Sequence, residues 1–532
     1  MRNFLNIIGV VLIGVLNKIS ATSFAKTYGG ANEDFCYSVK QTNDGGYIAA
    51  GYTTSFGTGY EDFLIIKLSS IGNLEWAKTF GKQYGYREIA YSIQETNDGG
   101  YIVAGYTDSF DGEGDFLIIK LFSNGNIEWV KTLGGNSVEE AYSIQETNDG
   151  GYIIAGYTNS FGAGLEDFLI VKLSSNGTLE WAKTFGGIYQ DYALSIQQTN
   201  DGGYIVAGYT NSFTAGEGDF LVIKLSSTGE MEWAKIFGGQ DEDGAFFVQQ
   251  TNDGGYIVAG ATFSFSVNWV DFLIIKLSPT ASIEWAKTFS VGSYNYALSI
   301  QQTDDGGYIV TGVRYANSGD FLVIKLSSTG NIEWKKIFDG GSNDIARSVE
   351  QTNDGGYIIA GRTNSFGAGN YDFLIVKTQD GQMASDCPWY EATNLITLSP
   401  YVISSFTSPM VTSPNLIIHS PSITVLSPSI LTYDVCSQSC QELPSLGEDN
   451  PKVSYFSFDK DKISLMFSGY FGEKIKIILY DILGKEIISK SYKFSPYLQI
   501  KEEKIEKLSK GIYFLKIYSN GKEIGRFKMI KK

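Results

Sequence analysis

The sequence predicts an all-β protein: a closed ring of seven four-stranded units, followed by a small C-terminal β-sandwich. The phrase "TNDGGYIVAGYT" occurs at Thr96–Thr107 and again at Thr199–Thr210, with near-copies elsewhere. An aromatic content of 14% and 61 glycines against 10 prolines suit short strands joined by tight turns. By subtraction, the aspartates of the phrase lie 49 to 54 residues apart: Asp44, Asp98, Asp149, Asp201, Asp253, Asp305 and Asp354. This spacing is typical of the blades of a β-propeller.

The first 21 residues contain an apolar run, Phe4–Leu16, with a basic residue before it and small residues around Ala21. The run is shorter than the about 20 apolar residues that a membrane-spanning helix needs. Residues 1–21 are therefore predicted to be a secretory signal peptide, with a buried first strand as the alternative. No other stretch is long and apolar enough to cross a membrane, so the mature chain is predicted to lack a transmembrane segment.

Each repeat divides into four strands, as the unit Glu140–Gly187 shows. "AYSIQET", "YIIAGYT", "DFLIVKL" and "LEWAKTF" are strands, separated by the turn "NDGG", a Gly/Ser-rich loop and the turn "SSNGT". Two of the strands are almost continuously apolar, which indicates burial on both faces between neighbouring blades. In a propeller the first strand would line the central channel.

The ends of the repeat array indicate that the ring closes. The fourth strand carries a tryptophan in six repeats: Trp76, Trp129, Trp181, Trp233, Trp285 and Trp334. The seventh repeat stops after Asp372–Lys377, whereas "TSFAKTYGG" at Thr22–Gly30 matches the missing strand, with Phe24 in the tryptophan position. Residues 22–378 are therefore predicted to form a seven-bladed β-propeller in which the N-terminal strand completes the last blade.

Three resemblances support this fold. "KLSSTGNIEWKKIFDG" (Lys325–Gly340) resembles the tryptophan-docking motif of quinoprotein-type propellers. "TNDGG" is similar to the Asp-box turn of sialidase-like propellers, without the tryptophan expected after it. The repeats as a whole resemble short-repeat propellers of secreted bacterial proteins, a likeness that implies the fold and not an activity.

The loops between blades contain a repeated acid, two positions before the small residue of each inner strand. The set is Asp34, Glu88, Glu139, Asp191, Asp243, Asn295 and Asp344. Such residues around one mouth of the channel would suit Ca²⁺ or a cationic group. The alternative, favoured because the feature repeats in every blade, is that each acid accepts backbone N–H groups and holds its loop.

The same face has aromatic residues that differ between blades, among them Tyr86, Tyr189, Tyr192, Tyr294 and Tyr296. Aromatic rings beside acids and amides suit sugar or peptide recognition, whereas the alternative is that they pack the loops. The predicted binding residues are these tyrosines with the repeated acids.

The propeller offers no obvious catalytic set. The single histidine, His419, lies outside the repeats, which argues against histidine-based catalysis and histidine metal sites in the ring. The acids before "FLIIK" are interpreted as caps at strand entry. A binding, adhesion or structural function without a cofactor is favoured over catalysis, and the alternative is a glycan-active hydrolase or lyase that uses carboxylates of the variable loops.

Residues 379–449 lack the blade pattern and repeat Ser-Pro, which predicts an extended linker. A small cysteine-closed β element is the alternative, because Cys387 could bridge to Cys436 or Cys440 in an exported protein.

Residues 450–532 have strand patterns typical of a compact β-sandwich. "LYDILGKEI", "LSKGIYFLKIYSNGK" and the terminal "RFKMIKK" closely resemble the type A C-terminal sorting domain of the type IX secretion system. The resemblance implies export across the outer membrane of Bacteroidota-type bacteria by that machinery, with the product secreted or attached to the cell surface. A net charge of −17 argues against nucleic acid as a partner.

Overall fold

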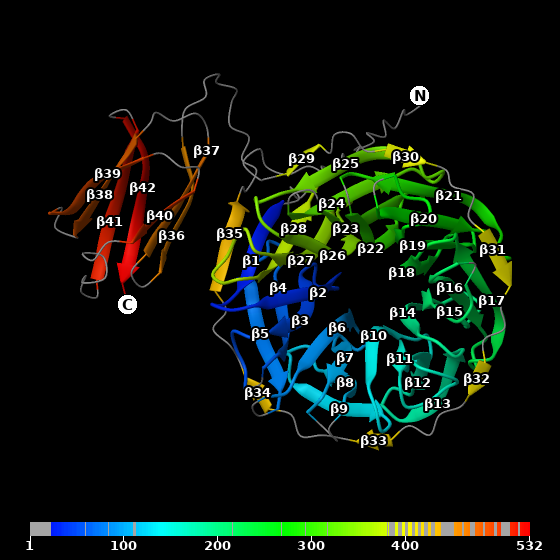
Figure 1. The fold of residues 1–532 in the computed structure, drawn as a ribbon. Helices are drawn as coiled ribbons and strands as arrows, with labels where there is room; N and C mark the ends of the chain where they lie inside the picture. Colours follow the sequence, from blue (N-terminus) through cyan, green and yellow to red (C-terminus); the bar gives the residue numbers. More distant parts are fainter. Residues whose placement is uncertain are drawn as a thin grey trace, which may run out of the picture.

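The computed structural model describes residues 23–381, apart from short gaps at 59, 83–84, 110–112, 215, 268, 293, 316–317 and 380, and after them the strands β29–β42 together with residue 485. All regular elements in this part of the chain are strands. The predicted signal peptide, residues 1–21, lies outside the described residues. Seven sheets surround a central axis, as Figure 1 shows.

Blades 1 to 6 place four antiparallel strands in chain order from the axis outward, and in blade 7 the N-terminal strand β1 takes the fourth place. The innermost strands of blades 1 to 7 are β2 (Asp34–Gln41), β6 (Glu88–Glu95), β10 (Glu139–Glu146), β14 (Asp191–Gln198), β18 (Asp243–Gln250), β22 (Tyr294–Gln302) and β26 (Asp344–Gln351). The second strands are β3 (Tyr47–Thr53), β7 (Tyr101–Thr107), β11 (Tyr152–Thr158), β15 (Tyr204–Thr210), β19 (Tyr256–Thr262), β23 (Tyr308–Tyr315) and β27 (Tyr357–Thr363). The third strands are β4 (Asp62–Leu68), β8 (Asp115–Leu121), β12 (Asp167–Leu173), β16 (Asp219–Leu225), β20 (Asp271–Leu277), β24 (Gly319–Leu326) and β28 (Asp372–Thr378). The fourth strands are β5 (Leu74–Gly81), β9 (Ile127–Gly134), β13 (Leu179–Gly186), β17 (Met231–Gly238), β21 (Ile283–Ser290), β25 (Ile332–Phe338) and, in blade 7, β1 (Phe24–Gly29).

The ring closes as predicted, through β1. This strand pairs with β28, with Tyr28 opposite Phe373 and Phe24 opposite Lys377. The same register places a tryptophan opposite the equivalent lysine in the other blades, for example Trp181 opposite Lys172. Phe24 therefore occupies the tryptophan position of blade 7.

The hydrophobic core lies between blades rather than inside any one of them. Each cluster of buried residues combines two neighbouring blades, and the cluster that holds Phe24 and Phe373 of blade 7 with Val39 of blade 1 seals the ring. The aromatic residue at the tryptophan position of each fourth strand also contacts a second-strand tyrosine of the next blade, edge-on in six blades and tilted for Trp334. Trp181 meets Tyr204 with ring centroids 5.9 Å apart, and Phe24 meets Tyr47 at the same distance. These contacts repeat around the ring and therefore make its closure cooperative.

A belt of seven short strands surrounds the ring (Figure 1), and each strand pairs with the outer edge of one blade. The belt strands are β29 (Trp389–Glu391), β30 (Ile396–Leu398), β31 (Ile403–Phe406), β32 (Met410–Thr412), β33 (Ile417–His419), β34 (Thr424–Leu426) and β35 (Leu431–Ser437). They pair with blades 6, 5, 4, 3, 2, 1 and 7 in that order, so the belt runs around the ring in the opposite sense to the blades. Blades with five strands result, and the backbone groups that an edge strand would leave open are paired.

The belt strands differ from the extended linker that the composition of residues 379–449 predicts. Belt strands start every seven residues, from 389 to 431, because the chain must advance by one blade between pairings. In the sequence, five of the six intervals between belt strands contain a proline. His419 belongs to this belt, where its backbone pairs with Thr132 of blade 2. Cys387 and Cys440 lie outside the described residues, as does the side chain of Cys436, so the disulfide remains a prediction.

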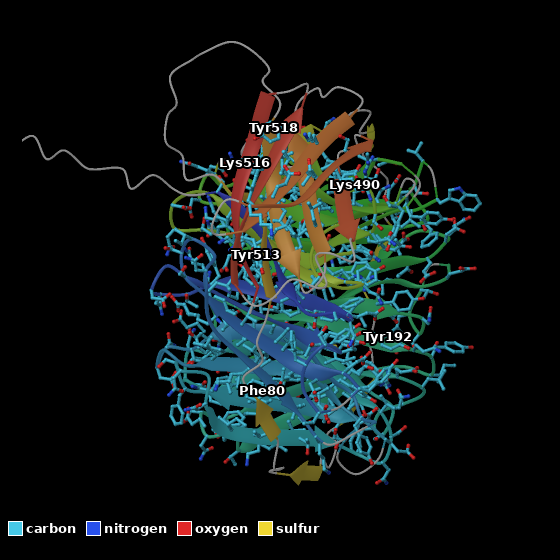
Figure 2. All side chains as sticks on the ribbon, turned by 90° about the vertical axis from the view of Figure 1, so that its left-hand side faces the viewer. Phe80, Tyr192, Lys490, Tyr513, Lys516 and Tyr518 are labelled. Atoms are coloured by element: carbon cyan, nitrogen blue, oxygen red, sulfur yellow. The ribbon has the colours of Figure 1, made fainter. Side chains whose placement is uncertain are left out.

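The C-terminal segment forms two antiparallel sheets, in agreement with the predicted β-sandwich. One sheet contains β36 (Lys452–Asp459), β37 (Lys462–Ser468) and β40 (Tyr497–Lys501). The other contains β38 (Lys474–Asp481), β39 (Glu486–Lys493), β41 (Gly511–Ser519) and β42 (Lys522–Lys531). Figure 2 labels Tyr513, Lys516 and Tyr518 on β41 and Lys490 on β39. Leu515 and Ile517 are fully buried, which gives this sheet one apolar face.

Candidate functional site

The ring has two faces of different character. The turn face contains the "NDGG" turns between first and second strands and the turns between third and fourth strands. The loop face contains the longer connections after the second and fourth strands. Figure 2 shows the ring edge-on, with Tyr192 toward one face. Because the turn face repeats almost unchanged while the loop face varies, a specific site belongs on the loop face.

The turn face is explained by one buried lysine per blade. In blade 3, the Lys172 ammonium lies 3.0 Å from Asp149 of the "NDGG" turn and 3.2 Å from Glu180 of the fourth strand, and its side chain is 2% exposed. Although burial raises it, hydrogen bonds from Thr147, Gly151 and Lys172 lower the pKa of Asp149 to about 2. The repeated aspartate therefore holds the turn against its blade through an ion pair and hydrogen bonds.

The seven predicted loop-face residues are fully buried, so they do not form an accessible ring at the channel mouth. All seven have 0% of their surface exposed: Asp34, Glu88, Glu139, Asp191, Asp243, Asn295 and Asp344. Five of them accept a backbone N–H from the loop before their strand; Asp191, for example, accepts from Gly187 at 2.8 Å and from the Ser212 hydroxyl at 2.7 Å. The geometry matches the alternative in which these residues hold the loops.

Each of these residues meets a second acid at the junction between blades. Asp191 of blade 4 and Asp167 of blade 3 both lie against Gly186, where an added Cβ would overlap the Asp167 carboxyl and come 2.9 Å from Asp191 Oδ2. Asp167 also accepts the Ala163 N–H at 2.6 Å, so it caps the strand entry as predicted. At the junction of blades 5 and 6 one member of the pair is an amide instead of an acid. There the Asn295 amide donates to Asp271 at 3.3 Å.

Burial of these paired acids favours their protonated form. Burial, with the nearby charge of Asp34, raises the pKa of Asp372 to about 7. Burial and the nearby Asp62 raise the pKa of Glu88 to about 9. Burial raises the pKa of Asp167 to about 6, and Asp191 contributes to this shift. Six of the seven junctions join two acids, whereas no group of three or more His, Cys, Asp or Glu side chains comes together among the described residues. The predicted Ca²⁺ ring is therefore not formed by the residues that the structure describes.

The central channel is lined by groups that already bond between blades. Ser143 accepts the Ile196 N–H of the next blade at 3.3 Å, and Gln145 accepts the Gln198 N–H at 2.6 Å. The cavity on the axis has a volume of about 240 Å³. Since its polar side chains connect neighbouring blades, we interpret the channel as part of the scaffold.

Blade 5 departs from the others on the loop face. Facing positions of the first and second strands hold Tyr192 and Tyr209 in blade 4, but Gly244 and Ala261 in blade 5. No other blade has small residues at both positions. The two missing side chains leave space beside the channel mouth.

That space is a pocket of about 230 Å³ with aromatic walls. Its lining residues are Tyr142, Tyr192, Leu194, Tyr209, Glu242, Gly244, Phe246, Ala261, Phe263 and Tyr296. Glu242 is the one charged side chain among them, and it is exposed. Burial raises the pKa of Tyr192 to about 12, and burial together with Glu242 raises that of Tyr209, so both phenols stay protonated at neutral pH.

The structure brings some of the predicted tyrosines together and separates others. Tyr192 and Tyr296 line the blade-5 pocket from its two sides. Tyr294 is exposed and stacks on Trp269, with ring centroids 6.4 Å apart and 18° between the planes. Trp269 is 69% exposed and has a φ of +95°, a conformation that tryptophan rarely adopts. Tyr86 and Tyr189 are also exposed but do not line this pocket.

Sequence reasoning missed the residues that create the pocket. Gly244 and Ala261 carry no chemistry of their own, and the search was for aromatic and acidic side chains. Their signal was available in the aligned repeats, because each stands where most other repeats have a larger residue. Phe263, Phe246 and Glu242 were missed for a different reason: they are aromatic and acidic, but only the cavity connects them.

Comparisons with known proteins agree with both parts of the architecture. Residues 458–532 match the family model of the secretion system C-terminal sorting domain. Residues 96–128 and 147–180 match that of a β-propeller domain of unknown function (DUF5122). The predicted propeller and the predicted sorting domain are confirmed, and the sorting domain assigns the chain to export through type IX secretion, as a secreted or outer-membrane-attached protein.

Other comparisons add little. No curated protein matches the chain. Among solved structures, a match is the "Crystal structure of tetra-tandem repeat in extending region of large adhesion protein", at 8% identity over 88% of this chain and 93% of that chain. Its TM-score of 0.12 is too low to support any conclusion. In the part of the chain that the structure describes, no helix is long and apolar enough to span a membrane.

Proposed function

We propose that this exported propeller is a recognition protein that binds a ligand on its loop face, in the pocket of blade 5. The observation that carries the proposal is the pairing of Gly244 with Ala261, which opens an aromatic cavity in one blade of an otherwise regular ring. Scaffold features repeat in every blade, whereas a binding site for one ligand needs a single asymmetric position. A concave apolar pocket with few polar groups is the usual form of such a site.

Two further observations support binding. The exposed Trp269–Tyr294 stack is formed by the loop of blade 5 and the first strand of blade 6, two of the blades that line the pocket. Trp269 keeps its strained backbone while most of its ring faces solvent, and strain of this kind clusters at functional positions. Aromatic rings held open to solvent are typical of surfaces that contact a partner.

The geometry favours binding over the glycan hydrolase or lyase that the loop acids suggested. Hydrolysis of a glycosidic bond uses two carboxyl groups on either side of it, about 5 to 10 Å apart. Among the described residues that line the pocket, one carboxyl group, that of Glu242, faces the space. The acids of the blade junctions are buried in pairs and hold the loops together.

The test is a glycan and peptide array probed with the full-length protein, with and without Ca²⁺. Gly244→Tyr restores the residue of blade 4 and fills the pocket, so it is expected to abolish binding of any ligand that the array reveals. Thr228→Tyr places the same side chain at an exposed turn on the opposite face and serves as the matched control. Ligands that Gly244→Tyr binds as well as the original protein, or an array without any ligand, would contradict the proposal.

A further inference from the structure

Blade 7 has a cation in contact with aromatic rings at the position where blade 5 has its pocket. In blade 7, Arg362 occupies the position of Ala261, since Arg362 faces Ile345 as Ala261 faces Gly244. Its guanidinium carbon lies 4.1 Å from the ring centroid of Phe35 in blade 1 and 5.0 Å from that of Tyr371. A cation of one blade is therefore held against aromatic rings at the junction with the next.

The equivalent position at the junction of blades 5 and 6 keeps one of these two aromatic rings, as Tyr296, and lacks the cation; Val270 stands where blade 7 has Tyr371. Tyr296 corresponds to Phe35, because each follows the buried residue that opens its inner strand, Asn295 or Asp34. Ala261 stops at Cβ, and both Ala261 and Tyr296 line the cavity. Blade 5 thus leaves open the space that a guanidinium fills in blade 7.

The charges around the pocket are also suited to a cation. Glu242 is at its rim, and among the described residues no lysine or arginine lines it. Burial is the main cause that raises the pKa of Tyr209 and of Tyr192; Glu242 and Glu217 add to it for Tyr209, and Glu166 and Glu140 for Tyr192. In blades 7 and 1, by contrast, Arg347 and Arg362 act on Tyr37 in the opposite direction.

The volume of the pocket limits the size of its ligand. A cavity of about 230 Å³ is smaller than the roughly 300–1,000 Å³ of ordinary small-molecule sites, and suits one side chain. A flat guanidinium stacks on aromatic faces and gives up its hydration more readily than an ammonium. Its apolar stem would contact Leu194 and Phe246, while its charge lies near Glu242.

Building on the function proposed above, we infer that the blade-5 pocket binds a guanidinium group on an apolar stem. Two sources present this chemistry: an arginine side chain of a partner polypeptide, and a small free guanidine. In either case the ligand places its cation between Tyr296 and Glu242, as Arg362 lies against Phe35 and Tyr371.

The probes are capped arginine (N-acetyl-arginine amide) and capped citrulline, which has nearly the same shape without the charge, titrated into the full-length protein by ligand-observed NMR. Capped arginine is expected to bind with a Kd in the millimolar range, as about 4 kcal/mol from a single side chain implies. Capped citrulline is expected to bind at least tenfold more weakly. A Gly-Arg-Gly peptide and agmatine then separate the sources, because a polypeptide site binds the peptide and a site for free guanidines binds agmatine alone.

Two substitutions examine the geometry. Ala261→Arg supplies the pocket with an internal cation, as in blade 7, and is expected to remove binding of capped arginine. Glu242→Gln is expected to weaken capped arginine three- to tenfold and to leave capped citrulline unchanged. Equal binding of the two probes, or binding that Ala261→Arg leaves intact, would overturn the inference. If the array reveals an uncharged ligand whose binding is lost in Gly244→Tyr, the proposed function stands and only the guanidinium assignment is overturned. If no ligand binds the loop face, both the proposed function and the guanidinium assignment are overturned.

Discussion

The two faces of the ring use carboxylates in opposite electrostatic settings. On the turn face each aspartate is paired with a buried lysine, and for Asp149 the pKa falls to about 2. On the loop face the acids are buried against one another, and the pKa of Asp372 rises to about 7. The same residue type is therefore held by a cation on one face and by a proton on the other. Sequence position alone does not reveal which, because both kinds of aspartate repeat in every blade.

The largest expected effect is a different pH response of the two faces. Loop-face acids have raised pKa values in the folded protein. The stability that they contribute to the fold is therefore complete below about pH 4, the pKa of such acids in the unfolded chain. It is lost as the pH rises through their folded-state pKa values of about 6 to 9. At about 1.4 kcal/mol per pKa unit, the loss summed over the junctions amounts to several kcal/mol. Turn-face aspartates contribute above about pH 4 and lose that contribution toward pH 2; since the Asp149 side chain is 59% exposed, solvent reduces its share.

Thermal unfolding of the full-length protein from pH 3 to pH 9 measures this response, and maximum stability is expected near pH 4 to 5. Asp191→Asn provides the control, because it copies the natural Asn295–Asp271 junction and should flatten the decline above pH 5. Constant stability between pH 5 and pH 8 would show that the junction acids are not protonated.

A pair of glycine substitutions compares packing on the two faces. Gly186 lies against Asp167 and Asp191 on the loop face, so Gly186→Ala is expected to destabilise the ring by about 3 kcal/mol through overpacking. Gly150 of the turn has a φ of +77° and open space around it, so Gly150→Ala is expected to cost about 1 kcal/mol of backbone strain. Chemical denaturation of both variants gives the two values, and a larger loss for Gly150→Ala would reverse the comparison.

Removing one of the aspartate–lysine ion pairs of the turn face measures its contribution directly. Asp149→Asn keeps the shape of the turn but removes the charge closest to the buried Lys172 ammonium, which retains Glu180 at 3.2 Å. We expect a loss of about 2 kcal/mol, less than the 3–5 kcal/mol for a buried charge left without any partner. Lys172→Met leaves no buried charge and should cost less; denaturation curves that rank the two variants the other way would contradict this account.

The smallest effect is expected where the loop face is specialised for binding. Gly244→Tyr introduces the residue that blade 4 carries at the same position, so the free energy of unfolding should change by no more than about 0.5 kcal/mol. Differential scanning calorimetry measures the shift. A large loss of stability would show that the pocket has a structural purpose of its own.

The sequence predicted much of the ring, because its signals are local and repeated seven times. The "NDGG" turns, the alternating strands and the match of Thr22–Gly30 to a fourth strand led to the blade count and to closure through β1. The belt was missed because its strands have three to seven residues and pair with partners that lie, by subtraction, from 51 residues (Phe338 with Trp389) to 413 residues (Phe24 with Ser437) away. Its signal, a seven-residue period with Pro400, Pro414, Pro421 and Pro428 in register, is one that composition does not show.

The candidate site was only partly predictable. Tyr192 and Tyr296 were recognised from their residue type, but the acids placed beside them at the channel mouth proved to be buried at the blade junctions. Burial depends on which strands face each other across two blades, and a single repeat read alone does not contain that information. The pocket itself is defined by side chains that are missing, at Gly244 and Ala261.

The position of β1 between β28 and β35 has a consequence for the order in which the chain assembles. Tyr28 pairs with Phe373 and Thr27 with Tyr433, separations of 345 and 406 residues by subtraction. Contacts this distant in the chain form late, since the entropy of closing so long a loop must be overcome before they stabilise anything. The segment that leaves the ribosome first among the described residues is thus the last to find its neighbours, and the circle stays open at least until β28, which ends at Thr378, has been made.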